Sequence, residues 1–224
     1  MDQAGPQKHS PGTRPGECLL VQEIFTSVIG EGTSAGRPGV IVRLTGCNLR
    51  CSYCDTQYAY TGGNQTGLPE LIKKIEKHKQ KRVLLTGGEP LLQKPVHNLL
   101  RELNNEGHET MIETNGSLDI RPIPKETKTI MDIKTPGSGY ARHCMMENLD
   151  WLKPADNVKF VITDGKDYNF SRNIIKKRRL PEKCAVIMSP AHGTMDPALL
   201  AEWILKDKLD VVLGLQLHKY INVK

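Results

Sequence analysis

Three cysteines lie close together in one short stretch of the sequence: Cys47, Cys51 and Cys54. Their spacing is C-x3-C-x2-C, directly after an apolar run that is typical of a strand. Structural zinc sites usually take four ligands, commonly as two C-x2-C pairs, and no second pair follows here. A cubane cluster normally takes four thiolates. Three thiolates therefore indicate an iron–sulfur cluster with one iron open to an outside ligand, such as the amino and carboxylate groups of a methionine moiety.

A second apolar run, Val83–Leu85, is followed by the segment Thr-Gly-Gly-Glu-Pro. Because Gly87 and Gly88 carry no Cβ, a ligand could approach the backbone closely at this strand end. Taken alone, the glycine pair is also compatible with an ordinary turn.

The two segments together resemble the radical S-adenosylmethionine (SAM) superfamily, in which an aromatic residue, here Tyr53, precedes the last cysteine. The resemblance implies a [4Fe-4S] cluster on the three cysteines. It also implies reductive cleavage of SAM to a 5′-deoxyadenosyl radical, with the protein supplying binding and orientation. In that superfamily the Gly-Gly-Glu-Pro segment, here with Gly88 and Glu89, receives the methionine amine.

The elements that must position these residues alternate along the chain. Strands are predicted at 40–44, 83–85, 110–113, 129–133, 158–163, 185–188 and 211–217, and helices at 69–79, 96–106, 169–177 and 197–205. This alternation favours a parallel sheet, and 224 residues are few for a full eight-unit barrel of about 250. We therefore expect an α/β fold, a reduced and open (β/α) partial TIM barrel of the radical SAM type. Residues 1–17 read as a disordered leader and residues 18–224 as a single domain.

Further segments narrow the resemblance. They are Phe25–Gly32, Arg43, Cys54–Thr56, Glu113–Gly116 and His218–Lys224. Together they resemble the 7-carboxy-7-deazaguanine synthase family. The resemblance implies conversion of 6-carboxy-5,6,7,8-tetrahydropterin to 7-carboxy-7-deazaguanine with loss of ammonia, on the route to 7-deazapurine nucleosides such as queuosine in tRNA. It further implies a homodimer, a magnesium ion and an external, flavodoxin-like electron donor.

Arg43 lies in an apolar strand that leads into the cysteine loop. A buried guanidinium needs an anionic partner, and its planar fork suits a carboxylate. An internal pair with Glu31 is one possibility, while the resemblance points to the carboxylate of the substrate. For Thr56 the resemblance implies a magnesium ligand, although the residue alone would suit a turn.

The resemblance also implies the remaining contacts. The pterin would lie against Val28, Ile29, Gly30, Glu31, Arg43, Thr86, His218 and Lys224. SAM would contact Tyr53, Cys54, Asp55, Gly88, Glu89, Asp132, Ile133, Lys134, Lys159, Phe160, Val161 and Ile162. The stretch 159–162 is equally typical of a plain barrel strand, and His218 could be a packed or exposed imidazole near a frayed end. Ile29 stands where the family usually has glutamine.

Composition restricts the partners. The net charge is +6, but the basic residues cluster at 73–82 and 176–179 in predicted amphipathic helices, where lysines usually form a solvated face. Aromatic residues make up 5% of the chain, so platforms for stacking bases are few and direct nucleic-acid binding is not expected. No apolar run approaches a bilayer span and no signal peptide is evident, so we expect a cytoplasmic enzyme without membrane contact.

Two other readings share the cysteine spacing. A glycyl-radical-enzyme activase would act on a protein partner, and a non-catalytic iron–sulfur or zinc protein would use the cysteines as a scaffold. The surroundings of Arg43 and Thr56 favour the small-molecule enzyme over both.

Overall fold

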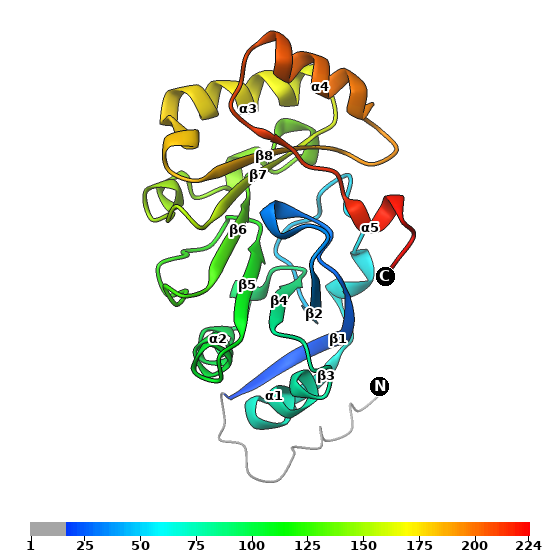
Figure 1. Ribbon diagram of the computed structural model, residues 1–224, viewed down its shortest axis with the longest axis vertical. Helices are drawn as coiled ribbons and strands as arrows, with labels where there is room; N and C mark the ends of the chain where they lie inside the picture. Colours follow the sequence, from blue (N-terminus) through cyan, green and yellow to red (C-terminus); the bar gives the residue numbers. More distant parts are fainter. Residues whose placement is uncertain (1–16) are drawn as a thin grey trace, which may run out of the picture.

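The computed structural model describes residues 17–224 (Figure 1). The predicted leader lies outside the described residues except for Glu17, whose carbonyl accepts a hydrogen bond from the Leu68 amide over 3.1 Å.

One nine-stranded sheet runs through the molecule in the order β3-β1-β2-β4-β5-β6-β7-β8-β9. The strands are β1 (Cys18–Val28), β2 (Pro38–Leu44), β3 (Asn64–Gly67), β4 (Arg82–Gly87), β5 (Glu109–Thr114), β6 (Lys128–Asp132), β7 (Asn157–Ile162), β8 (Ala185–Pro190) and β9 (Val212–Leu213). Strand β1 is antiparallel to both of its neighbours, and all pairs from β2 to β9 are parallel. Because β3 and β9 end the sheet without pairing, the barrel is open, as expected from the sequence.

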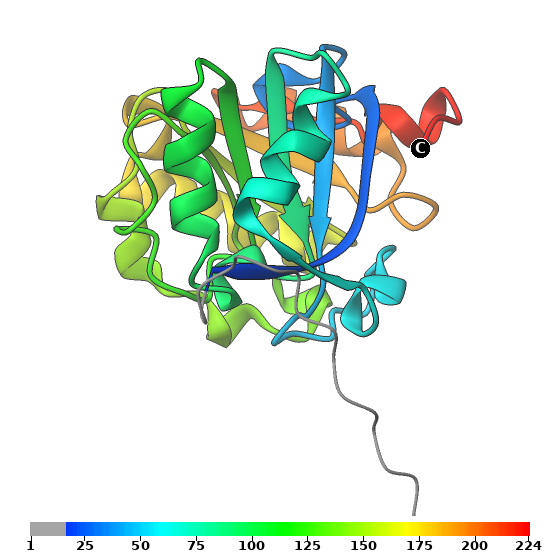
Figure 2. The ribbon, with the colours of Figure 1, turned by 90° about the horizontal axis from the view of Figure 1, so that it is seen from below.

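The main helices are α1 (Leu68–Glu76), α2 (Val96–Asn105), α3 (Gly165–Arg178) and α4 (Pro197–Lys206). Each overlaps one of the four predicted helices. Helix α2 buries Val96, Leu99, Leu100 and Leu103, the i, i+3, i+4, i+7 pattern of an amphipathic helix. Figure 2 shows α1 and α2 side by side across the sheet, and α3 and α4 cover its other end in Figure 1. None of the helices in the described part combines the length and the apolarity that a bilayer span requires.

Alternate residues of each strand face opposite sides of the sheet. The outer set, which includes Val42, Leu85 and Phe160, packs with the helices into the main core. The inner set begins with a smaller cluster of Ile29, Ile41, Leu84, Met111 and Ile130. This second cluster forms an apolar plug inside the curve of the sheet.

The predicted strand 211–217 was wrong over most of its length. Only Val212 and Leu213 are strand, and Leu217–Tyr220 form the one-turn helix α5. A Cβ on Gly214 would lie 2.3 Å from Ile187 Cγ2, so the chain crosses the edge of the sheet at a residue without a side chain. The Leu217 amide then donates to the Gly30 carbonyl over 2.9 Å, a tertiary contact that overrides the β-rich local sequence.

Strand β1 is the longest strand and was not predicted. Its pairing with β2 shifts register between Val21 and Glu23, so the alternation of buried and exposed residues is interrupted. Such a bulge removes the period-2 signal by which a strand is predicted. The short strand β3 was also missed, since Asn64–Gly67 carries polar turn residues.

Candidate active site

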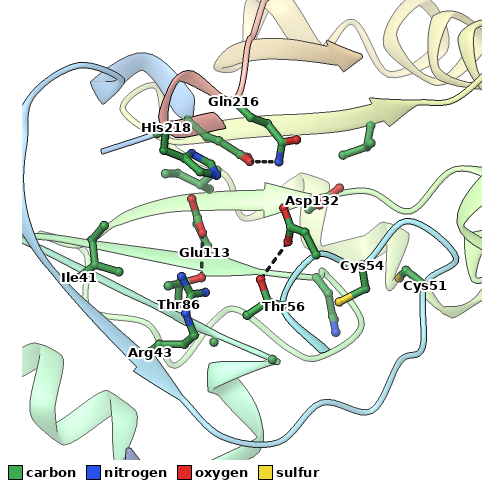
Figure 3. A pocket seen from close by; sticks show the side chains of 18 of the residues that line it. Ile41, Arg43, Cys51, Cys54, Thr56, Thr86, Glu113, Asp132, Gln216 and His218 are labelled. Atoms are coloured by element: carbon green, nitrogen blue, oxygen red, sulfur yellow. Dashed lines mark hydrogen bonds between the residues drawn. The ribbon is translucent and has the colours of Figure 1, made fainter. Parts of the chain in front are cut away.

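A cavity of about 420 Å³ opens at the carboxyl ends of the parallel strands, inside the curve of the sheet (Figure 3). Ile41, Leu84 and Ile130 of the apolar plug form its floor. Polar side chains lie two residues further along these strands and on the neighbouring strands of the sheet. A step of two residues keeps a side chain on the same face of the sheet. This polar layer consists of Arg43, Thr86, Glu113, Asp132 and Lys159.

The three cysteines line one side of the cavity, on the loop that follows β2. All are free thiols and partly exposed. The loop is held by short contacts: the Cys54 amide donates to the Cys51 carbonyl over 3.1 Å, and the Leu49 amide lies 3.4 Å from Cys47 Sγ. Burial raises the pKa of the Cys51 thiol. Within residues 17–224 no three His, Cys, Asp or Glu side chains converge as ligands of a single metal ion.

The glycine pair at the end of β4 packs against the start of this loop. A Cβ on Gly87 would lie 2.2 Å from the Leu44 carbonyl oxygen, and a Cβ on Gly88 would lie 2.1 Å from that of Gly46. The Glu89 amide donates to the same Gly46 carbonyl over 2.7 Å. The absence of side chains is therefore needed for the approach of the cysteine loop itself, and Gly88 also lines the cavity.

Glu89 is fully buried and does not line the cavity. Its oxygens accept hydrogen bonds from the Leu91 amide, the Thr114 hydroxyl and the Asn115 amide, at 2.6–3.0 Å. The side chain thus ties the end of β4 to the end of β5. Its own hydrogen bonds give it a structural role below the cavity wall.

Arg43 points into the cavity from β2 (Figure 3). Its Nε donates to Glu23 Oε1 over 2.8 Å, and its guanidinium lies 5.9 Å from the ring centroid of Tyr58. The internal partner is therefore Glu23 on the missed strand β1, not the Glu31 considered from the sequence. Since Glu23 occupies one of five N–H donors, donors remain for a carboxylate ligand.

Glu31 instead pairs with Lys159, and Gln216 Nε2 donates to its other oxygen over 2.6 Å. Lys159 Nζ also lies 3.5 Å from Asp132 Oδ2, which accepts from Lys134 Nζ over 2.8 Å. Burial favours the neutral form of each group. The attraction between opposite charges outweighs it, lowering the pKa of Glu31 and Asp132 and raising that of both lysines.

Two buried polar atoms in this region have no hydrogen-bond partner among the described residues: Asp132 Oδ1 and the Tyr53 hydroxyl. Buried polar groups are almost always paired, so these atoms are available to a ligand. Both residues line the cavity next to the cysteine loop. A free carboxylate oxygen suits a ribose hydroxyl, and Lys134 beside it suits a carboxylate. The residues present therefore fit SAM bound at an iron–sulfur cluster.

Helix α5 contributes to another part of the cavity wall. His218 and Lys219 line the cavity, and Lys219 forms an ion pair with Asp55. Burial disfavours the charged Asp55 carboxylate, but the bond from Lys219 prevails and lowers its pKa to about 2. At the end of the chain the Lys224 carbonyl accepts from the Ser27 hydroxyl. The C-terminal segment is thereby fixed to β1 and to the cysteine loop.

Thr56 lines the cavity next to the cysteine loop, and its hydroxyl donates to Asp55 Oδ1 over 2.9 Å. A hydroxyl with an adjacent carboxylate provides the hard oxygen atoms that magnesium prefers, and this ion usually keeps several waters. Thr56 and Asp55 therefore fit a magnesium ion whose remaining ligands are water or substrate oxygens.

Glu113 in the centre of the polar layer was not among the predicted site residues. Its Oε2 accepts from the Thr86 hydroxyl over 2.8 Å. Burial, followed by repulsion from Glu31, raises the pKa of this carboxyl. A weak signal for it was present, because Glu113 directly follows the apolar pair Met111-Ile112 at the end of a predicted strand. Gln216 had no such signal, since it fell in a predicted strand, whereas Lys219 lies in the segment His218–Lys224 that was singled out without a role for this lysine.

The structure brings most of the predicted residues to the cavity. Those on its wall are Val28, Gly30, Glu31, Arg43, Cys47, Cys51, Tyr53, Cys54, Asp55, Thr56, Thr86, Gly88, Asp132, Lys134, Lys159, Val161, His218 and Lys224. Five others do not line it: Ile29, Glu89, Ile133, Phe160 and Ile162. Phe160 and Ile162 face the helices because they are out of phase with Lys159 and Val161, and Ile29 belongs to the apolar plug.

Known proteins resemble this chain at the level of sequence and fold. The model of the radical SAM superfamily matches residues 41–133. The 7-carboxy-7-deazaguanine synthase of Koribacter versatilis is 39% identical over 91% of this chain and 96% of its own length. That of Methanospirillum hungatei is 38% identical over 98% and 92%. The crystal structure of QueE from Escherichia coli superposes with a TM-score of 0.74 at 20% identity, covering 90% of this chain and 95% of that one.

Proposed function

The chain belongs to the 7-carboxy-7-deazaguanine synthase family of radical SAM lyases, and we propose that its cavity binds 6-carboxy-5,6,7,8-tetrahydropterin beside SAM. The enzyme forms 7-carboxy-7-deazaguanine with loss of ammonia and uses a [4Fe-4S] cluster, SAM and Mg²⁺. When bound, the cluster and SAM supply a radical that removes a hydrogen atom from the substrate, and magnesium supplies a template for its oxygens.

Arg43 is the observation that supports binding of the pterin substrate in this cavity. Its guanidinium is held by Glu23 behind it, and its remaining donors face the cavity between the apolar floor and the cysteine loop. A fixed, largely desolvated guanidinium selects a planar carboxylate. The substrate carboxylate therefore binds here, and the flat ring rests on the floor of Ile41, Leu84 and Ile130.

The other walls orient the two ligands. Glu31, Thr86 and His218 face the pterin, while Tyr53, Asp132 and Lys134 hold SAM next to Cys47, Cys51 and Cys54. Asp132 Oδ1 accepts a hydrogen bond from a ribose hydroxyl of SAM, since this oxygen has no hydrogen-bond partner within residues 17–224. Thr56 contributes its hydroxyl to magnesium.

Glu113 handles a proton. A carboxyl whose pKa is raised holds its proton more readily and can give it to a leaving group. The loss of ammonia needs such a proton on the departing nitrogen. Glu113 lies in the middle of the polar layer and so faces the centre of the bound ring.

The wider setting follows from the same family. One domain covering residues 18–224 acts in the cytoplasm as a homodimer and takes electrons from an external flavodoxin-like donor. The match to the radical SAM superfamily and to the synthase relatives supports a small-molecule enzyme of the radical SAM type.

An anaerobic assay tests the function. The cluster is reconstituted to four irons per chain, and the enzyme is incubated with the carboxylated pterin, SAM, dithionite and magnesium. We expect 7-carboxy-7-deazaguanine; a cluster-loaded enzyme that cleaves SAM but yields none would exclude this substrate.

A second arm isolates Arg43. Affinities are compared for the carboxylated pterin and for 6-methyltetrahydropterin, which lacks the carboxylate. A hydrogen-bonded charge pair contributes about 1.5–3 kcal/mol, so the wild type should prefer the carboxylated pterin by roughly ten- to a hundredfold. In Arg43→Met this preference should disappear. An unchanged preference would place the carboxylate elsewhere.

A further inference from the structure

A chain of hydrogen bonds and ion pairs crosses the cavity from its C-terminal wall to the cysteine loop. It runs from Gln216 to Glu31, on to Lys159 and Asp132, and ends at Lys134. Lys134 Nζ in turn lies 5.8 Å from the ring centroid of Tyr53, which precedes the last cysteine. Segments far apart in the sequence are thus connected through side chains that are at most 14% exposed at the charged positions.

Lys159 is the central member of this chain. It lies on β7 with the side chain on the inner face, and Asp132 stands opposite it in the parallel register of β6 and β7. On one side its ammonium contacts Glu31, and on the other it lies 3.5 Å from Asp132 Oδ2. The ammonium is therefore shared unequally between two carboxylates, and the Glu31 contact is the closer one.

Under the proposed function these two carboxylates serve different ligands. All three residues line the cavity, and the proposed function assigns Glu31 to the pterin and Asp132 and Lys134 to SAM. We propose that Lys159 is a positioning residue that couples the binding of the pterin to the binding of SAM. This inference rests on the proposed function.

The coupling follows from competition for one ammonium. When an N–H group of the pterin donates to Glu31, this carboxylate attracts Lys159 less, and the ammonium moves toward Asp132 Oδ2. There it replaces Lys134, which is now 2.8 Å from the same oxygen. Lys134 is then free to meet the carboxylate of SAM, while Asp132 Oδ1 stays available for the ribose. In a site of low dielectric constant such small shifts carry a large electrostatic effect.

Pterin binding therefore strengthens SAM binding, and by thermodynamic linkage SAM strengthens pterin binding by the same factor. Couplings of this kind are typically fivefold or more. An enzyme with such coupling commits SAM to cleavage only when the substrate is in place.

The test measures affinities without turnover. Cluster-loaded enzyme is kept anaerobic and free of reductant, and the Kd for SAM is measured by equilibrium dialysis with and without saturating 6-carboxytetrahydropterin. In the wild type the pterin should lower the Kd at least about fivefold, and in Lys159→Met the ratio should fall to about one. The matched control is Lys153→Met, which removes an ammonium 3.1 Å from Asp156 Oδ1 and outside the cavity wall. It should keep the wild-type ratio.

A double variant guards against simple misfolding. Lys159→Met leaves buried carboxylates without a cation, which is costly, whereas Lys159→Met/Glu31→Gln removes one charge of each sign. Its stability should recover toward the wild type while the ratio stays at about one. Recovery of the ratio in the double variant would overturn the proposal, because Lys159 would then only balance charge. Absence of coupling in the wild type would overturn it as well.

The proposed function is judged separately by turnover. Product formation by the wild type and by Lys153→Met supports it whatever the coupling ratio. If the wild type neither binds nor converts the pterin, the proposed substrate is wrong, and that outcome is distinct from the loss of coupling.

Discussion

An alanine at Gly30 should displace His218 without disturbing the rest of the fold. A Cβ built on Gly30 lies 1.9 Å from His218 Nδ1 and 2.9 Å from both Cγ and Cε1 of the ring. Real Cβ atoms keep at least 3.0 Å, so the contact is 1.1 Å too short. Gly30 is not among the glycines with positive φ, so alanine can adopt its backbone conformation. The imidazole must therefore move.

The ring has two ways to move, and both take it from its place in the cavity. Helix α5 can shift as a whole, which breaks the 2.9 Å bond from the Leu217 amide to Gly30 and costs about 1 kcal/mol. Alternatively the side chain leaves its rotamer at a cost of about 0.5–1.5 kcal/mol. A displacement near 1 Å at a reacting centre can cost about a hundredfold in rate. We expect kcat/KM of Gly30→Ala to fall roughly 30- to 100-fold, or about 2–3 kcal/mol.

Steady-state kinetics under anaerobic conditions measure this effect, with thermal unfolding as a check on the fold. Helix α5 lies outside the main core, so Tm should drop by less than about 4 °C. The control is Gly165→Ala, whose Cβ would come no closer than 3.7 Å to Trp203 and should be silent. In Gly30→Ala/His218→Ala the clash is absent, so this variant should match His218→Ala. A Gly30→Ala enzyme within threefold of the wild type (~0.6 kcal/mol) would refute the reasoning.

Two other variants probe the polar layer and the magnesium ligand. Glu113→Gln should unfold at higher urea concentration than the wild type at pH 7. Burial raises the folded-state pKa of Glu113 above its usual 4.5, so ionisation of Glu113 destabilises the fold as pH rises through the folded pKa. The gain in stability of Glu113→Gln over the wild type should therefore vanish as pH falls toward 4.5. Equal stability of the two proteins at pH 7 would contradict this reasoning. The kcat of Glu113→Gln should fall about a hundredfold, because an amide transfers no proton. Thr56→Val should raise the magnesium concentration for half-maximal activity about tenfold or more (~1.4 kcal/mol) and leave the Kd for SAM unchanged; an unaltered magnesium requirement would exclude the hydroxyl as a ligand.

The sequence alone determined the elements whose signals are local. The alternation of β-branched runs and amphipathic helices predicted strands β2 and β4–β8 and helices α1–α4, because side-chain periodicity reports burial directly. The cysteine spacing likewise needs no tertiary information, since one loop carries all three thiols. These features were sufficient to indicate an open barrel and cluster chemistry.

Only the tertiary structure decided which charged groups pair across the cavity. Arg43 meets Glu23 because β1 pairs with β2, and Lys159 meets Asp132 because β6 and β7 pair in parallel register. No local pattern encodes such pairings, and β1 itself lost its period-2 signal at the bulge.

The part of the cavity wall formed by the C-terminal segment was also decided by tertiary structure and not by local sequence. Gln216, His218 and Lys219 reach the site because the Leu217 amide bonds to Gly30, nearly two hundred residues earlier in the chain. The predicted strand 211–217 is cut short before this contact, and the one-turn helix α5 begins at Leu217. Sequence periodicity records which residues are buried, whereas the identity of a long-range partner depends on the fold that surrounds it.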